Sequence, residues 1–155
     1  MPTAAPPDTA LETISNSFAT VVRSAQLPRF FDLVIDRAGV RLERSAFPVL
    51  RRIGEHDGVR LSALAAQMNV DVSTMSRQVA ALERGRYIMR ETDAADARAS
   101  LLRLTPRGTR ALERLGNARR EILDEVLADW SPKDRAQFAP LLERFAADVA
   151  GFARR

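Results

Sequence analysis

Apolar residues recur at three- and four-residue steps along most of this chain, which is the spacing of one face of an α-helix. The first such stripe covers residues 11–25. Pro28 lacks an amide hydrogen and disfavours helical geometry in the residue before it, so a break is expected there. A second helix is expected over residues 28–37 and a third over residues 43–55, whereas residues 1–7, with three prolines, are expected to form a disordered tail.

The middle of the chain predicts two short helices separated by a tight turn. A short strand at residues 60–61 leads into a helix over residues 63–68, for which Ser62 is a suitable cap. A second helix is expected over residues 73–84. Its apolar face carries Met75, Val79 and Leu82. The pattern is typical of a helix-turn-helix, a unit that also occurs in proteins without a nucleic-acid role.

A β-hairpin and two long helices complete the chain. Residues 87–91 and 100–104 alternate enough to pair as strands, with residues 92–98 as the polar loop between them. Thr105 and Ser131 are each followed by proline, and a hydroxyl cap followed by proline is a common way for a helix to begin. The expected fold class is therefore mainly α with a small β-hairpin wing.

The apolar stripes near the two ends of the chain are longer than a small winged core can cover. One is the stripe over residues 11–25, and the other runs from Phe138 to Phe152. A large apolar face that its own subunit leaves exposed marks an interaction surface. Identical chains commonly cover such faces by pairing about a two-fold axis, so the pattern predicts a homodimer.

Positive charge is concentrated in one quarter of the chain. Lys and Arg number 24 and Asp and Glu 20, for a formal net charge of +4. Residues 73–110 hold eight arginines and four acidic residues, so this segment accounts for the whole excess. Such a concentration is typical of a surface that binds a polyanion such as double-stranded DNA, although a solvated helix face has the same composition.

The composition argues against several other classes of protein. The chain has no cysteine and a single histidine, His56, so we expect no metal site and no cofactor. Glu55, His56 and Asp57 form the only candidate catalytic group, and three adjacent residues seldom converge on one substrate, so we expect no enzyme. No apolar run is long enough to span a membrane and no signal peptide is evident, which predicts a cytoplasmic protein without a membrane partner.

Small, hydroxyl and amide side chains with one arginine fill the first two turns of the expected 73–84 helix. The candidate DNA-reading residues are Ser73, Thr74, Ser76, Arg77 and Gln78. Arginine can bond guanine, glutamine can pair with adenine, and hydroxyls can reach bases or phosphates. The alternative is an ordinary solvated helix start with Ser73 as its cap.

The expected wing carries one further candidate for DNA contact. Arg98 lies near the tip of the hairpin, where an arginine can enter the minor groove. A surface salt bridge is the alternative role for Arg98. Asp96 is expected to stabilise the wing by pairing with Arg98 or with Arg90.

Five short motifs follow one another through residues 41–108. They are LSALA at 61–65, VSTMSR at 72–77, LERGRYIMR at 82–90, DAADARA at 93–99 and LTPRG at 104–108. This ordered series resembles the MarR family of bacterial winged helix-turn-helix transcriptional regulators.

The resemblance implies a division of the chain and a role for the wing. It implies dimerisation helices over residues 8–40, a winged domain over residues 41–105, and C-terminal helices over residues 106–155 that interlock with the first ones. Asp96 and Arg98 match the acid and the arginine of the family's wing. Family members often carry a second basic residue just before that arginine, but here the position is Ala97. Arg98 is therefore expected to provide more of the wing's contact with DNA.

Many members of the family respond to a small molecule bound between the dimerisation helices and the winged domain. By position, Phe30, Phe31, Phe47 and His56 are the candidate residues for such a pocket. Plain core packing is the alternative for the three aromatic residues, and a loop near the end of the third helix is the alternative for His56.

The function that these features predict together is a sequence-specific DNA-binding transcriptional regulator. It is expected to act as a homodimer on a pseudo-palindromic operator, more often as a repressor than as an activator, with a small-molecule effector as a further partner. The main alternative is a winged-helix module that binds another protein and no DNA.

Overall fold

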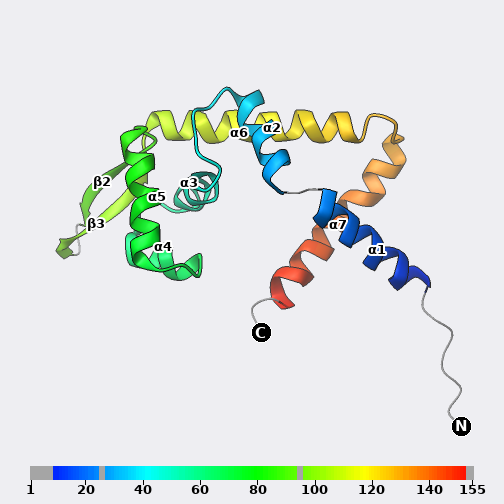
Figure 1. The fold of residues 1–155 in the computed structure, drawn as a ribbon, viewed down its shortest axis with the longest axis horizontal. Coiled ribbons are helices and arrows are strands. Elements are labelled where there is room, and N and C mark those ends of the chain that lie inside the picture. The colour runs from blue at the N-terminus through cyan, green and yellow to red at the C-terminus, as the bar shows by residue number, and fades with distance from the viewer. Residues whose placement is uncertain (1–8, 25–26, 94–95, 153–155) are drawn as a thin grey trace, which may run out of the picture. The chain divides into compact units, whose positions relative to one another are not determined.

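The computed structural model describes residues 9–24, 27–93 and 96–152 (Figure 1). Its elements, in chain order, are α1 (Thr9–Ser24), α2 (Leu27–Ala38), α3 (Ala46–Gly54), β1 (Val59–Arg60), α4 (Leu61–Gln67), α5 (Val72–Arg84), β2 (Ile88–Asp93), β3 (Asp96–Leu104), α6 (Pro106–Val126) and α7 (Pro132–Phe152). The expected tail over residues 1–7 lies outside the described residues. The chain divides into two compact units, residues 1–118 and residues 119–155.

The mainly helical fold with a small β wing is confirmed. Two of the expected helix starts are also present. Thr105 Oγ1 accepts a hydrogen bond from the Gly108 amide at 3.1 Å, and Ser131 Oγ accepts one from the Asp134 amide at 3.1 Å. Each hydroxyl thereby satisfies an amide that the first turn of its helix leaves without a backbone partner.

The expected cap of α4 is wrong. This helix begins at Leu61, with Arg60 in the capping position and no side-chain cap hydrogen bond. Ser62 therefore lies inside the first turn. The reason is that β1 runs directly into α4, so the extended backbone of Arg60, and no separate hydroxyl residue, marks the transition.

The three strands form one antiparallel sheet in the order β1-β3-β2. Val59 pairs with Leu102, and Ile88 pairs with Leu104 at the base of the hairpin. Pairing continues out to Asp93 and Asp96, with an irregularity after Thr92. The strands therefore extend into the segment expected as a loop. Polar residues pair there because the end of the wing has no buried face that would impose an apolar alternation.

The winged part of the first unit has a continuous apolar core. Helix α3 packs against α5 and β3, and α4 packs against α5, as the ribbon also shows (Figure 1). The largest fully buried side chains include Leu50, Ile53, Leu64, Met75, Leu82 and Leu102. Met75, Val79 and Leu82 are all completely buried, which confirms the predicted inner face of α5. No helix in the described part of the chain is long and apolar enough to cross a membrane.

The start of α6 is joined tightly to the residues that follow α5. The Thr105 amide donates to the Tyr87 carbonyl at 3.0 Å, and Thr105 Oγ1 donates to the Arg86 carbonyl at 2.7 Å. A Cβ atom on Gly108 would lie only 2.0 Å from the Tyr87 carbonyl oxygen, so this backbone approach requires glycine. The contact fixes the direction in which α6 leaves the winged core.

Candidate nucleic-acid interface

The candidate interface begins at the amino-terminal end of α5. Burial of Met75, Val79 and Leu82 turns the opposite side of the helix outward. Ser73 and Arg77 are exposed there, one helical turn apart. Thr74, Ser76 and Gln78 are partly exposed. The structure therefore brings the five predicted reading residues together in the first two turns of one helix.

Asp71 is the cap of α5, in place of the Ser73 cap that was the alternative for this segment. Its carboxylate accepts a hydrogen bond from the Thr74 amide at 2.7 Å. The hydroxyls of Ser73 and Thr74 also donate to it, at 2.5 and 2.7 Å. The bond from the Ser73 hydroxyl, followed by the two bonds from Thr74, lowers the pKa of Asp71 far below its ordinary value.

The cap also orders the side chains that face outward. Because both hydroxyl protons point to Asp71, the hydroxyl oxygens of Ser73 and Thr74 are left as acceptors. Thr74 Oγ1 already accepts a bond from Arg77 Nη2 at 3.3 Å. Asp71, Thr74 and Arg77 therefore form a connected polar chain at the tip of the helix.

The wing is held by two arginines on opposite sides of the sheet. Arg60, on β1, lies 2.5 Å from Asp93 and 3.8 Å from Asp96, measured from Nη2 to the carboxylate Oδ2 atoms. The hydrogen bond and the charge of Asp93 raise the pKa of Arg60. Arg90, on β2, donates from Nε to Glu83 Oε1 at 2.8 Å and so joins the hairpin to the carboxyl end of α5.

The expected pair between Arg90 and Asp96 is therefore wrong. Successive residues of a strand face opposite sides of the sheet, and Arg90 faces α5, where Glu83 lies. Asp96 is instead close to Arg60. The side chain of Arg98 lies outside the described residues, so its expected pairing and its approach to DNA stay predictions.

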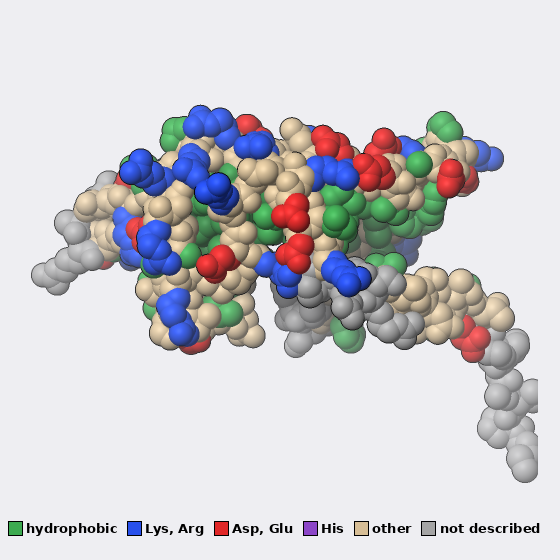
Figure 2. All heavy atoms as spheres, turned by 45° about the horizontal axis from the view of Figure 1, so that its top comes forward, with side chains coloured by type: hydrophobic (Ala, Val, Ile, Leu, Met, Phe, Trp, Pro, Cys, Tyr) green, Lys and Arg blue, Asp and Glu red, His purple; other side chains and the backbone are tan. Residues whose placement is uncertain are grey.

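A third arginine holds the base of the sheet. Arg103, on β3, pairs with Asp57 in the turn after α3 and lies 2.8 Å from Glu91 on β2, measured from Nε to Oε2. Basic side chains gather on the part of the molecule that carries the winged domain and the first turns of α6 (Figure 2). The sheet is therefore fixed by ion pairs at its base, and the surrounding surface is rich in positive charge.

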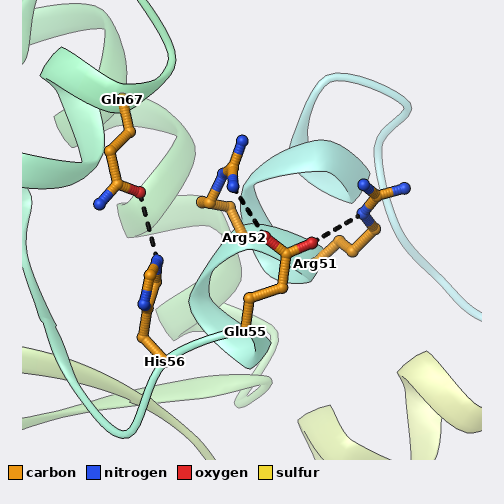
Figure 3. A network of polar contacts seen from close by, with 5 residues as sticks. All are labelled: Arg51, Arg52, Glu55, His56 and Gln67. Carbon is orange, nitrogen blue, oxygen red and sulfur yellow. Dashed lines mark hydrogen bonds and ion pairs between the residues drawn. The ribbon is translucent and has the colours of Figure 1, made fainter. Parts of the chain in front are cut away.

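The residues proposed for an effector pocket separate into two groups. Phe31 lies between Phe30 and Phe47, with ring centroids 6.4 and 5.6 Å apart, and Phe47 is buried. His56 is exposed beyond the other end of α3, where its Nε2 lies 3.3 Å from Oε1 of Gln67 (Figure 3). Phe47 and His56 are nine residues apart, about 13 Å along a helix. The structure therefore brings the three aromatic residues together and leaves His56 apart from them, and the effector pocket itself stays a prediction.

Figure 3 also shows what surrounds His56. Arg51 and Arg52 both donate to Glu55, at 3.2 and 2.8 Å, on the exposed end of α3. Within the described residues, no three histidine, cysteine or acidic side chains are placed to hold a metal ion. This cluster is an exposed helix end, as the alternative for His56 supposed.

Three residues of the interface were not expected from the sequence. Asp71 could have been found, because aspartate is a preferred cap and this one precedes the first helical residue. Arg60 and Glu83 carry no such local signal. Arg60 is 33 positions away from Asp93, and the two meet only because β1 joins the edge of the hairpin.

Comparison with known proteins assigns this winged domain to a family. The family model of MarR matches residues 42–100. The uncharacterized HTH-type transcriptional regulator YxaD of Bacillus subtilis is 35% identical over 134 residues, which cover 86% of this chain and 91% of YxaD.

Solved structures share the fold over nearly the whole chain. A MarR family protein from Bacillus stearothermophilus superposes with a TM-score of 0.79 at 18% identity, covering 94% of this chain and 99% of that one. A mutant of MepR from S. aureus, solved bound to an oligodeoxyribonucleotide, gives a TM-score of 0.63 at 20% identity, covering 86% and 97%. The family consists of transcriptional regulators and not of enzymes. This chain therefore belongs to the MarR family and is a DNA-binding transcriptional regulator.

Proposed function

We propose that the protein is a homodimeric repressor that reads a pseudo-palindromic operator with one α5 helix and one wing from each subunit. The observation that carries this proposal is the arrangement at the start of α5. There, Ser73 and Arg77 face outward, directly opposite the fully buried Met75 and Val79. A helix held this way presents its first turns to base edges in the major groove.

The roles within the interface follow from side-chain chemistry. Arg77 has the charge and the paired donors to bond guanine, and Gln78 has the donor and acceptor that match adenine. Arg98, Asp96 and Arg90 belong to the wing, with Arg98 as the minor-groove contact and the other two as residues that hold the hairpin. Contacts with phosphates supply affinity, and the first turns of α5 supply the choice of sequence.

The homodimer is proposed from two helices that leave apolar faces uncovered. On α1, Leu11 is 61% exposed and Val21 62% exposed. On α7, no described residue is buried, although Phe138, Leu141 and Phe145 recur at helical spacing. Each of these apolar faces needs a partner. A second copy of the chain carries the same two faces, so the faces of the two copies can cover one another. We therefore place the dimer interface on the interlocked terminal helices.

DNA binding by titration of fluorescence anisotropy tests the reading role. The protein is added to a labelled fragment from its own upstream region, with excess competitor DNA, at several salt concentrations. Selective binding that weakens with salt and is lost in Arg77→Ala and Arg98→Ala supports the proposal. Arg144→Ala is the matched control, because Arg144 is an exposed arginine on α7, paired at 3.8 Å with Asp148.

Two features of the proposal do not depend on how the protein reads DNA. The first is regulation, in which a small-molecule effector releases the protein from its operator. The second is a cytoplasmic location, which gives the protein access to DNA.

The anisotropy titration also tests the alternative function. If the purified protein prefers no DNA fragment, and neither Arg77→Ala nor Arg98→Ala changes binding, the winged-helix protein-interaction module is favoured instead. In that case, the partner is sought among proteins.

A further inference from the structure

A cavity of about 300 Å³ lies between the end of α2, the residues after α5 and the first turns of α6. Its wall includes Arg41, Arg107, Arg110 and Arg114, together with Val40 and Tyr87. All of these residues belong to the first compact unit. The volume is at the lower end of the range for small-molecule sites.

The charge of this cavity is uncompensated within the described residues. None of its four arginines forms an ion pair with a carboxylate there, whereas Arg44, Arg60, Arg90, Arg103 and Arg135 each do. Arg107, Arg110 and Arg114 recur at helical spacing and so share one side of α6. Like charges that line one cavity repel one another, and a bound anion relieves that repulsion.

The backbone around the cavity is built to let the arginines approach. Gly39 ends α2 in the left-handed conformation, with φ of 58°, and the following Val40 amide donates back to the Ile35 carbonyl at 3.3 Å. A Cβ atom on Gly39 would lie 2.9 Å from Arg114 Nη2, so glycine leaves room for that guanidinium.

Tyr87 contacts two of the four arginines, one through its backbone and one through its guanidinium. Its side chain is buried, and its hydroxyl donates to the Arg41 carbonyl at 2.8 Å, which holds the loop after α2. The guanidinium carbon of Arg107 lies 4.9 Å from the centroid of the same ring, in a cation–π contact. Tyr87 thus positions the guanidinium of Arg107 and the backbone of Arg41 at the wall of the cavity.

We propose that this cavity binds a small multivalent oxyanion, a compact polycarboxylate or phosphate compound, as the effector of the regulator. Guanidinium groups pair with carboxylate and phosphate oxygens through two parallel hydrogen bonds. Four of the eight residues that line the cavity are arginines, which suits a ligand that carries several negatively charged oxygens.

The cavity is distinct from the DNA-reading end of α5. Tyr87 follows the carboxyl end of this 13-residue helix, and that end lies about 16 Å along the axis from Ser73 and about 10 Å from Arg77. A ligand in the cavity would nevertheless touch the loop and helix that fix the winged core against α6. Its effect on the operator rests on the function proposed above, whereas binding of the anion itself does not.

Calorimetric titration of the full-length protein, without DNA, tests the site. Citrate and pyrophosphate are the probes, acetate is the monovalent control, and ionic strength is held constant with sodium chloride. We expect one saturable site per chain for at least one probe, with affinity reduced at least about tenfold in Arg110→Ala/Arg114→Ala. Whichever probe binds identifies the carboxylate or the phosphate source.

Two further variants control for the general loss of positive charge and for loss of folding. Arg119→Ala, an exposed arginine on α6 outside the cavity wall, should leave binding unchanged. Arg114→Gln is the milder variant if the double change does not fold, as judged by circular dichroism. Binding that does not saturate, or that is equal in wild type and cavity variants, overturns the proposal. So does a result in which these variants weaken only DNA binding, because the cavity would then be a phosphate contact of the operator.

The DNA measurement is made separately, so the two proposals can fail independently. Citrate or pyrophosphate that binds and also releases a bound operator fragment supports the site and its regulatory role. Saturable binding that leaves DNA affinity unchanged keeps the site and overturns the effector role. A protein that selects no DNA fragment refutes the repressor function and leaves the calorimetric result intact.

Discussion

Arg60 Nη2 lies 2.5 Å from Asp93 Oδ2, so a residue of the two-residue strand β1 holds the far part of the β2–β3 hairpin. A second bond runs from Arg60 Nε to the same oxygen at 3.0 Å. The side chain of Asp93 is only 12% exposed, whereas that of Arg60 is 44% exposed. The wing is therefore positioned from outside the hairpin.

We predict that Arg60→Ala loosens the wing and weakens DNA binding several-fold without unfolding the protein. Hydrogen exchange of the β2 and β3 amides, measured without DNA, should accelerate. Asp93→Asn should have the same effect, although it makes the surface more positive. Arg51→Ala, which removes an exposed ion pair on α3, is the control. Unchanged exchange in both wing variants would show that the pair does not position the hairpin.

The close approach of α6 to Tyr87 predicts opposite effects at two glycines of the same helix. A Cβ atom at position 108 meets the Tyr87 carbonyl oxygen, so Gly108→Ala should lower the free energy of unfolding by about 1–3 kcal/mol. A Cβ atom at position 116 meets nothing within 4 Å, so Gly116→Ala should raise it by up to about 1 kcal/mol. Urea unfolding measures both, and a neutral Gly108→Ala would contradict the tight contact.

Asp71 predicts a loss of stability in acid. Its pKa is lowered in the folded protein, so its contribution is complete above the unfolded value of about 3.9 and declines as the pH falls below it. Asp71→Asn retains a capping oxygen but does not titrate. The urea midpoint of wild type should therefore fall more steeply than that of Asp71→Asn below about pH 4.

Asp129→Asn serves as the control for the acid experiment, because Asp129 is an exposed carboxylate for which the described structure holds no ion pair. Its acid profile should follow that of wild type. Parallel profiles for wild type and Asp71→Asn would mean that the three hydrogen bonds at Asp71 do not favour its charged form.

The exposed face of α7 predicts that a single charge disrupts the dimer. Leu141 is 63% exposed, and a carboxylate at this position would be costly to bury against a second copy. We expect light scattering to give about twice the 17.2 kDa chain mass for wild type and a shift toward the chain mass for Leu141→Asp. Glu143→Gln, on the same exposed helix, is the control. A wild-type protein that is monomeric at micromolar concentration would overturn the homodimer.

The sequence predicted most of the fold because the signals involved are local. Helical spacing identified the buried face of α5, and the pairs Thr105-Pro106 and Ser131-Pro132 marked the starts of α6 and α7. The same local pattern located the five outward residues at the start of α5. Asp71 was missed, although its signal is also local, because the helix was expected to begin one residue later.

Tertiary structure alone decided which charged residues meet. Arg90 pairs with Glu83 because the hairpin packs against the end of α5, and Arg60 reaches Asp93 because β1 joins the sheet edge. The four arginines of the cavity come from two segments, the loop after α2 and the first turns of α6, that only folding brings together. Spacing along the chain fixes which face of a helix a residue occupies, but ion pairs and cavities depend on how elements distant in sequence pack, and that information is not local.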